Sequence, residues 1–197
     1  VGCTVVLADA WLPDAAVAAI DRHRASFMAG ATPFLTDLVD AADRAGSSLP
    51  SLRRFVCGGA SVPPELVRRA LARFTSAVVS RAYGATEVPL ICPGIRERDE
   101  AGTRADTDGE CTSDVRIVDD AGRPVAEGTV GEIVVRSPQM FMGYLDPADD
   151  EDAYTPDGYF RMGDLGRRIA GKYLELTGRK KDIIIRKGEN ISPLEIE

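Results

Sequence analysis

The first half of the chain alternates short apolar runs with amphipathic stretches. Apolar residues recur at helical spacing in three segments, which predicts helices over 13–24, 33–45 and 64–74. Short apolar runs between and before them predict buried strands at 4–7, 53–57 and 77–80, with a further short apolar segment at 26–29. Strands that alternate with helices of this length predict βαβ units and a parallel sheet.

The second half has a different pattern, with short strands separated by turn residues. A polar, glycine-containing loop is expected over 93–111. The strand-like runs after it are 114–118, 130–136, 159–162, 166–169 and 172–176. They predict an antiparallel meander or a small barrel, and we expect the acidic run 149–152 to be a solvated loop.

The end of the chain predicts the start of another domain. Residues 176–182 form a charged linker in this interpretation, 183–185 form a new strand, and Pro193 opens a helix. We therefore expect an α/β subdomain over 1–92, a β-rich subdomain over 93–178, and a hinge with the start of a small C-terminal domain over 179–197. Because the chain opens in a strand-like run and stops in a predicted first helical turn, we expect a fragment of a longer protein.

Composition and charge exclude several classes of protein. The 197 residues are 44% hydrophobic and 28% charged, which is ordinary for a globular protein with a core. The net charge of −7 makes nucleic acid an unexpected partner. No apolar run approaches the roughly 20 residues that span a bilayer. The first residues show no charged-then-apolar pattern, so we expect no secretion signal. The four cysteines lie far apart, which indicates buried thiols in a reducing cytoplasm rather than a zinc site or a disulfide framework.

The stretch 80–87, Ser-Arg-Ala-Tyr-Gly-Ala-Thr-Glu, follows a predicted strand and carries the clearest candidate chemistry. Gly84 favours a turn, and ligands of open α/β sheets bind at the carboxyl ends of the strands. The hydroxyl of Thr86 beside the carboxylate of Glu87 suits a phosphate with its Mg²⁺, which prefers oxygen ligands. Tyr83 offers a flat face for a base. The alternative for this stretch alone is a solvated turn.

Three further motifs accompany this stretch. They are the Gly-Gly-Ala turn at 58–60, the Gly-Asp-Leu at 163–165 after Asp-Gly-Tyr-Phe at 157–160, and the Gly-Arg-Lys-Lys-Asp at 178–182 followed by Lys-Gly-Glu-Asn-Ile at 187–191. In this order and spacing the chain resembles the acyl-adenylate-forming enzymes, which include acyl-CoA synthetases, luciferases and the adenylation domains of peptide synthetases. The sequence of residues 30–34, Gly-Ala-Thr-Pro-Phe, is most similar to that of acyl- or cyclohexanecarboxylate-CoA ligases. The resemblance covers essentially the whole chain and implies a central fragment of such an enzyme.

The resemblance implies roles for particular residues. Tyr83 would lie against adenine, and the turn of Gly58, Gly59 and Ala60 would form another wall of that pocket. Asp164 would accept hydrogen bonds from the ribose hydroxyls, and Arg179 would cover ribose or phosphate. The remaining implied roles are a phosphate contact for Thr86, a Mg²⁺ ligand for Glu87, a hinge at Lys181, and an acyl pocket lined by Thr32, Phe34, Gly84 and Ala85, with Gly84 also beside the nucleotide. The family usually has Thr where this chain has Met162, which removes a hydroxyl contact there.

The implied activity is that of a carboxylate–CoA ligase. With ATP and Mg²⁺ it would convert a small carboxylic acid to acyl-AMP, and CoA would then take the acyl group. The family's phosphate loop would lie upstream and its adenylation lysine further downstream, so we expect the 197-residue chain alone to be inactive. Two alternatives remain open, namely an adenylation domain that loads a carrier protein and a non-catalytic nucleotide-binding module.

Overall fold

The computed structural model describes residues 2–59, 61–180, 184–186 and 189–191. The chain divides into two compact units. The first contains residues 1–82 and 94–106, and the second contains residues 83–93 and 107–197. The chain therefore passes from one unit to the other at 82–83, 93–94 and 106–107.

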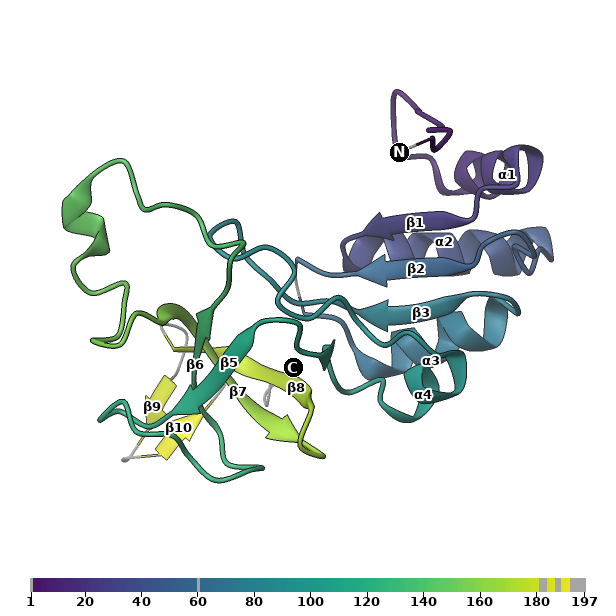
Figure 1. The fold of residues 1–197 in the computed structure, drawn as a ribbon. Helices are drawn as coiled ribbons and strands as arrows, with labels where there is room; N and C mark the ends of the chain where they lie inside the picture. The colour runs from purple at the N-terminus through teal and green to yellow at the C-terminus, as the bar shows by residue number, and fades with distance from the viewer. Residues whose placement is uncertain (1, 60, 181–183, 187–188, 192–197) are drawn as a thin grey trace. The chain divides into compact units, whose positions relative to one another are not determined.

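The first unit is a three-stranded parallel sheet with helices. The strand order is β1–β2–β3, with β1 at Phe27–Gly30, β2 at Arg54–Cys57 and β3 at Val78–Arg81. Its helices are α1 (Pro13–His23), α2 (Thr32–Ala45), α3 (Pro64–Arg73) and α4 (Arg98–Thr103). Helices α2 and α3 cover one face of the sheet (Figure 1). The predicted parallel βαβ arrangement is thus confirmed.

The helical pattern in this unit results from burial of one stripe of each helix. In α2 the buried positions are Leu35, Leu38, Val39, Ala41 and Ala42, which recur at helical spacing. Gly46 ends α2 with φ 65°, a left-handed conformation that costs glycine little. Proline stands in the first turn of α1, α2 and α3, where its missing N–H leaves no helical hydrogen bond unmade.

The second unit is built on an open antiparallel sheet of five strands in the order β4–β8–β7–β6–β5. The strands are β4 (Gly109–Glu110), β5 (Asp114–Val118), β6 (Gly131–Arg136), β7 (Phe160–Ile169) and β8 (Tyr173–Arg179). A short 3-10 helix, η1 (Pro147–Asp150), lies between β6 and β7, and β9 (Ile184–Arg186) pairs with β10 (Glu189–Ile191) in a separate two-stranded sheet. The meander is confirmed, and the sheet does not close into the alternative barrel.

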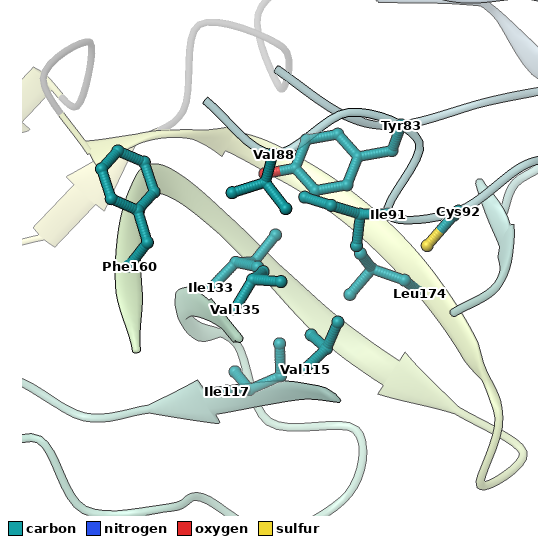
Figure 2. Close-up of a cluster of buried hydrophobic side chains, with 10 residues drawn as sticks. All are labelled: Tyr83, Val88, Ile91, Cys92, Val115, Ile117, Ile133, Val135, Phe160 and Leu174. Atoms are coloured by element: carbon teal, nitrogen blue, oxygen red, sulfur yellow. The ribbon is translucent and has the colours of Figure 1, made fainter. Parts of the chain in front are cut away.

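The core of the second unit joins residues 83–93 to the sheet. Figure 2 shows this cluster, in which Tyr83, Val88, Ile91 and Cys92 come from that segment. The strands contribute Val115, Ile117, Ile133, Val135, Phe160 and Leu174. Fully burying one such aliphatic or aromatic side chain contributes about 1.5–3 kcal/mol, so the segment is bound to the sheet by its own apolar residues.

Several expectations about individual elements are wrong. Residues 4–7 form no strand, and Val5 and Leu7 are exposed. The loop expected over 93–111 contains α4 and β4. The two strands expected at 159–162 and 166–169 are one strand, β7, with a register shift between Leu165 and Gly166. Residues 176–179 belong to β8 rather than to a linker, and the helix expected from Pro193 lies outside the described residues.

No helix in the described part of the chain has the length and apolar character needed to cross a membrane.

Candidate nucleotide site

The motif at 83–87 lies in a closed loop. The N–H of Tyr83 donates to the carbonyl of Cys92 at 2.9 Å, and the N–H of Cys92 donates back to Tyr83 at 3.0 Å. Inside this bridge the N–H of Ala85 donates to Val88 at 3.1 Å. A Cβ on Gly84 would lie 2.6 Å from the backbone nitrogen of Leu90, so the tight turn requires glycine there. The two ends of the loop are therefore fixed, and its tip carries Thr86 and Glu87.

Asp164 lies at the centre of a polar cluster in this unit. In the register of β7 and β8 it stands opposite Arg179. The hydroxyl of Tyr83 donates to its Oδ2 at 2.7 Å, and Nε of Arg179 lies 3.2 Å from its Oδ1. Asp164 is only 6% exposed. A buried carboxylate needs such partners, because an unpaired buried charge costs several kcal/mol.

The environment of Tyr83 differs from that of an exposed stacking platform. The residue is 8% exposed, and burial first and the carboxylate of Asp164 second raise the pKa of its phenol well above the ordinary value. The phenol therefore stays protonated as a donor to Asp164 at neutral pH. Only a small part of the residue faces solvent, so a base could contact it over a limited area.

Glu87 is held by residues from a distant loop. Its Oε1 accepts a hydrogen bond from the hydroxyl of Tyr144 at 2.9 Å, and its carbonyl accepts from the N–H of Phe141 at 2.8 Å. Desolvation and the nearby Glu87 raise the pKa of Tyr144 to about 12. Thr86, beside Glu87, is exposed. Sequence reasoning missed the contact with Tyr144, since the two residues are 57 positions apart and no local pattern connects them.

The site chemistry is compatible with Mg²⁺ at Glu87. Within the described residues no group of three or more His, Cys, Asp or Glu side chains could hold a metal ion by itself. Mg²⁺ is usually bound through one or two carboxylates together with substrate phosphates and water, so a single carboxylate beside the Thr86 hydroxyl fits that ion.

Other expected residues lie in the first unit, at the carboxyl edge of the parallel sheet. Register pairs Gly30 with Cys57 and Cys57 with Arg81, so the three strands end together. A Cβ on Gly58 would lie 2.8 Å from the carbonyl oxygen of Ala82, and Gly59 has φ 83°. Both positions therefore favour glycine for reasons of backbone geometry.

Thr32 and Phe34 begin α2 at the same edge. The hydroxyl of Thr32 donates to the carbonyl of Ser61 at 2.7 Å. Phe34 is 37% exposed and meets Trp11 edge to face, with ring centroids 4.9 Å apart. Two of the four residues expected in the acyl pocket, Thr32 and Phe34, therefore lie in the first unit, whereas Gly84 and Ala85 belong to the second.

The structure thus brings Tyr83, Asp164 and Arg179 together, with Glu87 in the same unit. Ala60 and Lys181 lie outside the described residues. Lys180, just before Lys181, is held by the buried carboxylate of Glu132, whose Oε2 lies 3.0 Å from its Nζ. Met162 is half-buried and packs against the apolar core.

Comparison with known proteins identifies the family. The model of the AMP-binding enzyme family matches residues 1–145 of this chain. The chain belongs to that family. The medium-chain fatty-acid–CoA ligase of Escherichia coli strain K12 is 36% identical over 200 residues, which cover all of this chain and 35% of that ligase.

Solved structures that are similar to this chain agree in fold. The amide bond synthetase McbA from Marinactinospora thermotolerans superimposes with a TM-score of 0.89 at 34% identity, over all of this chain and 40% of McbA. ATP-bound MatB from Rhodopseudomonas palustris gives a TM-score of 0.81 at 28% identity, over 95% of this chain and 37% of MatB. The chain therefore spans little more than a third of the length of these relatives.

Proposed function

We propose that this AMP-binding chain is the central part of an ATP-dependent carboxylate–CoA ligase. In the intact protein a carboxylate oxygen of the acid attacks the α-phosphorus of ATP, pyrophosphate leaves, and acyl-AMP forms. The CoA thiol then attacks the acyl carbonyl and releases AMP. Support comes from the family match, from the similar E. coli CoA ligase, and from the ATP-bound state of a structural relative.

One observation carries the nucleotide assignment, namely the buried carboxylate of Asp164 between two donors. A carboxylate held by Tyr83 and Arg179 is oriented in advance and can accept hydrogen bonds from the ribose hydroxyls, which charge makes stronger than neutral ones. In this proposal Arg179 covers ribose or phosphate and the exposed part of Tyr83 contacts adenine. Gly58, Gly59 and Ala60 form another wall of the proposed adenine pocket.

In this proposal the tip of the 83–92 loop binds the phosphates of ATP. Thr86 contacts phosphate, and Glu87, oriented by Tyr144, holds Mg²⁺, which neutralises charge on the transferring phosphate when it is bound. Thr32, Phe34, Gly84 and Ala85 line the acyl pocket. Lys181 serves as the hinge. Lys180, the residue before the hinge, is held in place by its ion pair with Glu132.

The acceptor of the acyl group has more than one candidate. The high structural similarity to an amide bond synthetase favours a test of amine acceptors beside CoA. An adenylation domain that loads a carrier protein would be followed by a carrier domain in the intact protein. Acceptor-dependent release of AMP, measured with CoA, simple amines and a carrier protein, distinguishes these possibilities.

Substitution of Asp164 in the intact protein tests the nucleotide assignment. Loss of a charged hydrogen bond costs about 1.5–3 kcal/mol, so Asp164→Asn and Asp164→Ala should raise the KM for ATP roughly 10- to 100-fold. The measurement is ATP–pyrophosphate exchange with a carboxylic acid that the parent uses. Asp149→Asn, at an exposed position of η1, is the matched control and should leave the KM unchanged. A folded Asp164 variant with the parent's KM for ATP would refute the ribose role.

We propose that the 197-residue chain alone does not catalyse adenylation, so measurable pyrophosphate exchange by it would refute this. A reducing cytoplasm remains the expected compartment in this proposal, since the structure holds the four cysteines as thiols rather than disulfides.

A further inference from the structure

Two cysteines that lie 19 residues apart in sequence meet beside the candidate nucleotide site. The Sγ atoms of Cys92 and Cys111 are 3.3 Å apart. Cys92 is fully buried and pairs through its backbone with Tyr83, whereas Cys111, which follows β4, is partly exposed. Neither thiol has a part in the proposed ligase chemistry.

The backbone around the two cysteines is already held together. The N–H of Thr112 donates to the carbonyl of Ile91 at 2.9 Å, and the hydroxyl of Thr112 donates to Leu90 and Ile91 at 3.1 and 3.2 Å. A disulfide bond is about 2.05 Å long, so the sulfurs need to approach by little more than 1 Å. Small side-chain rotations of the two cysteines supply such a movement without separating the segments.

We propose that Cys92 and Cys111 form an oxidation site, which closes to a disulfide under peroxide and reopens under thiol reductant. The disulfide joins the end of the 83–92 loop to the segment after β4. This proposal stands on the sulfur geometry and does not depend on the proposed ligase function.

The two thiols differ in the direction in which their pKa values are shifted, and this difference assigns their order of reaction. A hydrogen bond from Cys92 lowers the pKa of Cys111, and Arg168 acts in the same direction against burial and the nearby carboxylates of Asp108 and Glu110. The hydrogen bond to Cys111 and burial both raise the pKa of Cys92. Cys111 is therefore the thiolate that meets the oxidant, and Cys92 is the resolving thiol.

The chemistry balances with hydrogen peroxide as the oxidant. The Cys111 thiolate attacks one peroxide oxygen, the O–O bond breaks, and Cys111 becomes a sulfenic acid. The departing hydroxide takes up the proton that the Cys111 thiol had released to solvent and leaves as water. The Cys92 sulfur then attacks the Cys111 sulfur, its S–H proton leaves with the sulfenic oxygen as a second water, and the S–S bond forms. Two thiols are oxidised and one peroxide is reduced.

Peptide mapping of the oxidised chain tests the proposal. The chain carries Cys3→Ser, because exposed Cys3 could link two molecules. After peroxide treatment, remaining thiols are alkylated in denaturant and the protein is digested with trypsin. We expect peptides 82–96 and 105–116 to be joined, with a mass about 2 Da below their sum, and to separate on reduction. Peptide 55–68, which carries buried Cys57, is the internal control and should be fully alkylated.

A second measurement asks whether the bond tightens the loop. Hydrogen exchange at the amides of Tyr83 and Cys92 should slow about tenfold or more on oxidation, because a cross-link opposes opening of their bridge. Cys111→Ser, which keeps nearly the same size, should show neither the joined peptides nor the slower exchange. Full alkylation of Cys92 and Cys111 after peroxide treatment, or Cys111 oxidised beyond sulfenic acid without a cross-link, would overturn the proposal.

Discussion

At the scale of single residues, the hydroxyl of Tyr83 links two motifs that lie far apart in sequence. Tyr83 and Asp164 are 81 positions apart, yet their side chains form a buried hydrogen bond of 2.7 Å. Each motif could be recognised in the sequence. The contact could not, because it depends on the way residues 83–93 pack against β7 and β8. The contacts of Tyr144 with Glu87 and of Cys92 with Cys111 escaped the sequence for the same reason.

Tyr83→Phe tests how much the buried hydroxyl contributes to stability. Without its donor, Asp164 is less well satisfied, and the free energy of unfolding at pH 7 should fall by about 1–3 kcal/mol. The pKa of Tyr83 is raised in the fold, so above about pH 10 the unfolded chain releases a proton that the folded chain retains, and the parent loses stability as pH rises. Tyr83→Phe lacks this loss.

The difference in the free energy of unfolding between the parent and Tyr83→Phe should therefore narrow between pH 9 and 11. This range follows from the ordinary pKa of about 10 for a phenol in the unfolded state, and urea unfolding at each pH measures the difference. Tyr144→Phe is the comparison, and it should change stability by less than about 0.5 kcal/mol at pH 7, because that residue is exposed. A gap that stays constant over this range would contradict the assigned pKa shift.

At the scale of elements, the long strand β7 shows both the strength and the limit of hydrophobic patterning. The pattern found apolar segments at both ends of β7 but predicted a break between them. The structure keeps one strand and absorbs the irregularity in a register shift between Leu165 and Gly166, which leaves Asp164 opposite Arg179. A bulge depends on pairing with neighbouring strands, so the pattern of one strand does not reveal it.

Gly166→Ala tests the close packing at this shift. A Cβ there would lie 2.7 Å from the carbonyl oxygen of Glu175 and 2.9 Å from Cδ1 of Ile133. The backbone or Ile133 must move, and we expect a loss of about 1–3 kcal/mol in the free energy of unfolding. Gly102→Ala in α4 is the control, since its Cβ would meet only Leu71 at 3.9 Å, and it should be neutral or stabilising. Equal stability of Gly166→Ala and the parent would show that the space can be made without strain.

Helices were easier to predict than strands in this chain. The segments predicted as helices at 33–45 and 64–74 agree with α2 and α3 to within one residue, because each buries a regular stripe and has proline in its first turn. The apolar run 4–7 carries the same local signal as the true strands but has no neighbouring strand to pair with among the described residues. A strand needs a partner, and the local sequence does not specify one.

At the scale of the whole molecule, the chain forms two units that it enters and leaves more than once. The candidate site residues follow this division, with the Gly58–Gly59 turn in the first unit and Tyr83, Glu87, Asp164 and Arg179 in the second. The sequence placed a boundary near residue 92 and did not reveal that residues 83–93 and 94–106 belong to different units. Strand-end residues can pack with either neighbour, and only tertiary contacts decide between them.

Two buried cysteines allow the stability of each unit to be measured separately. Cys57 is fully buried in the first unit and Cys92 in the second. Pulsed alkylation over a urea series should therefore report unfolding of each unit, and the fluorescence of Trp11, the only tryptophan, reports the first unit as well. With Gly166→Ala we expect the Cys92 midpoint to fall while the Cys57 and Trp11 midpoints stay in place, because domains commonly unfold as separate units. Equal shifts at both cysteines would instead indicate one cooperative transition.

The hydrogen bonds between Tyr83 and Cys92 bring the start and finish of the intervening stretch close together. Residues added or removed between Tyr83 and Cys92 would change the length of this loop. The backbone before Tyr83 and after Cys92 would keep its course. The motif could thus diverge in size and chemistry among descendants of a common ancestor without loss of the surrounding scaffold. For an engineer, the same property makes Ala85 a suitable position to vary when new acids are sought as substrates, while Thr86, Glu87 and the buried Val88 are kept.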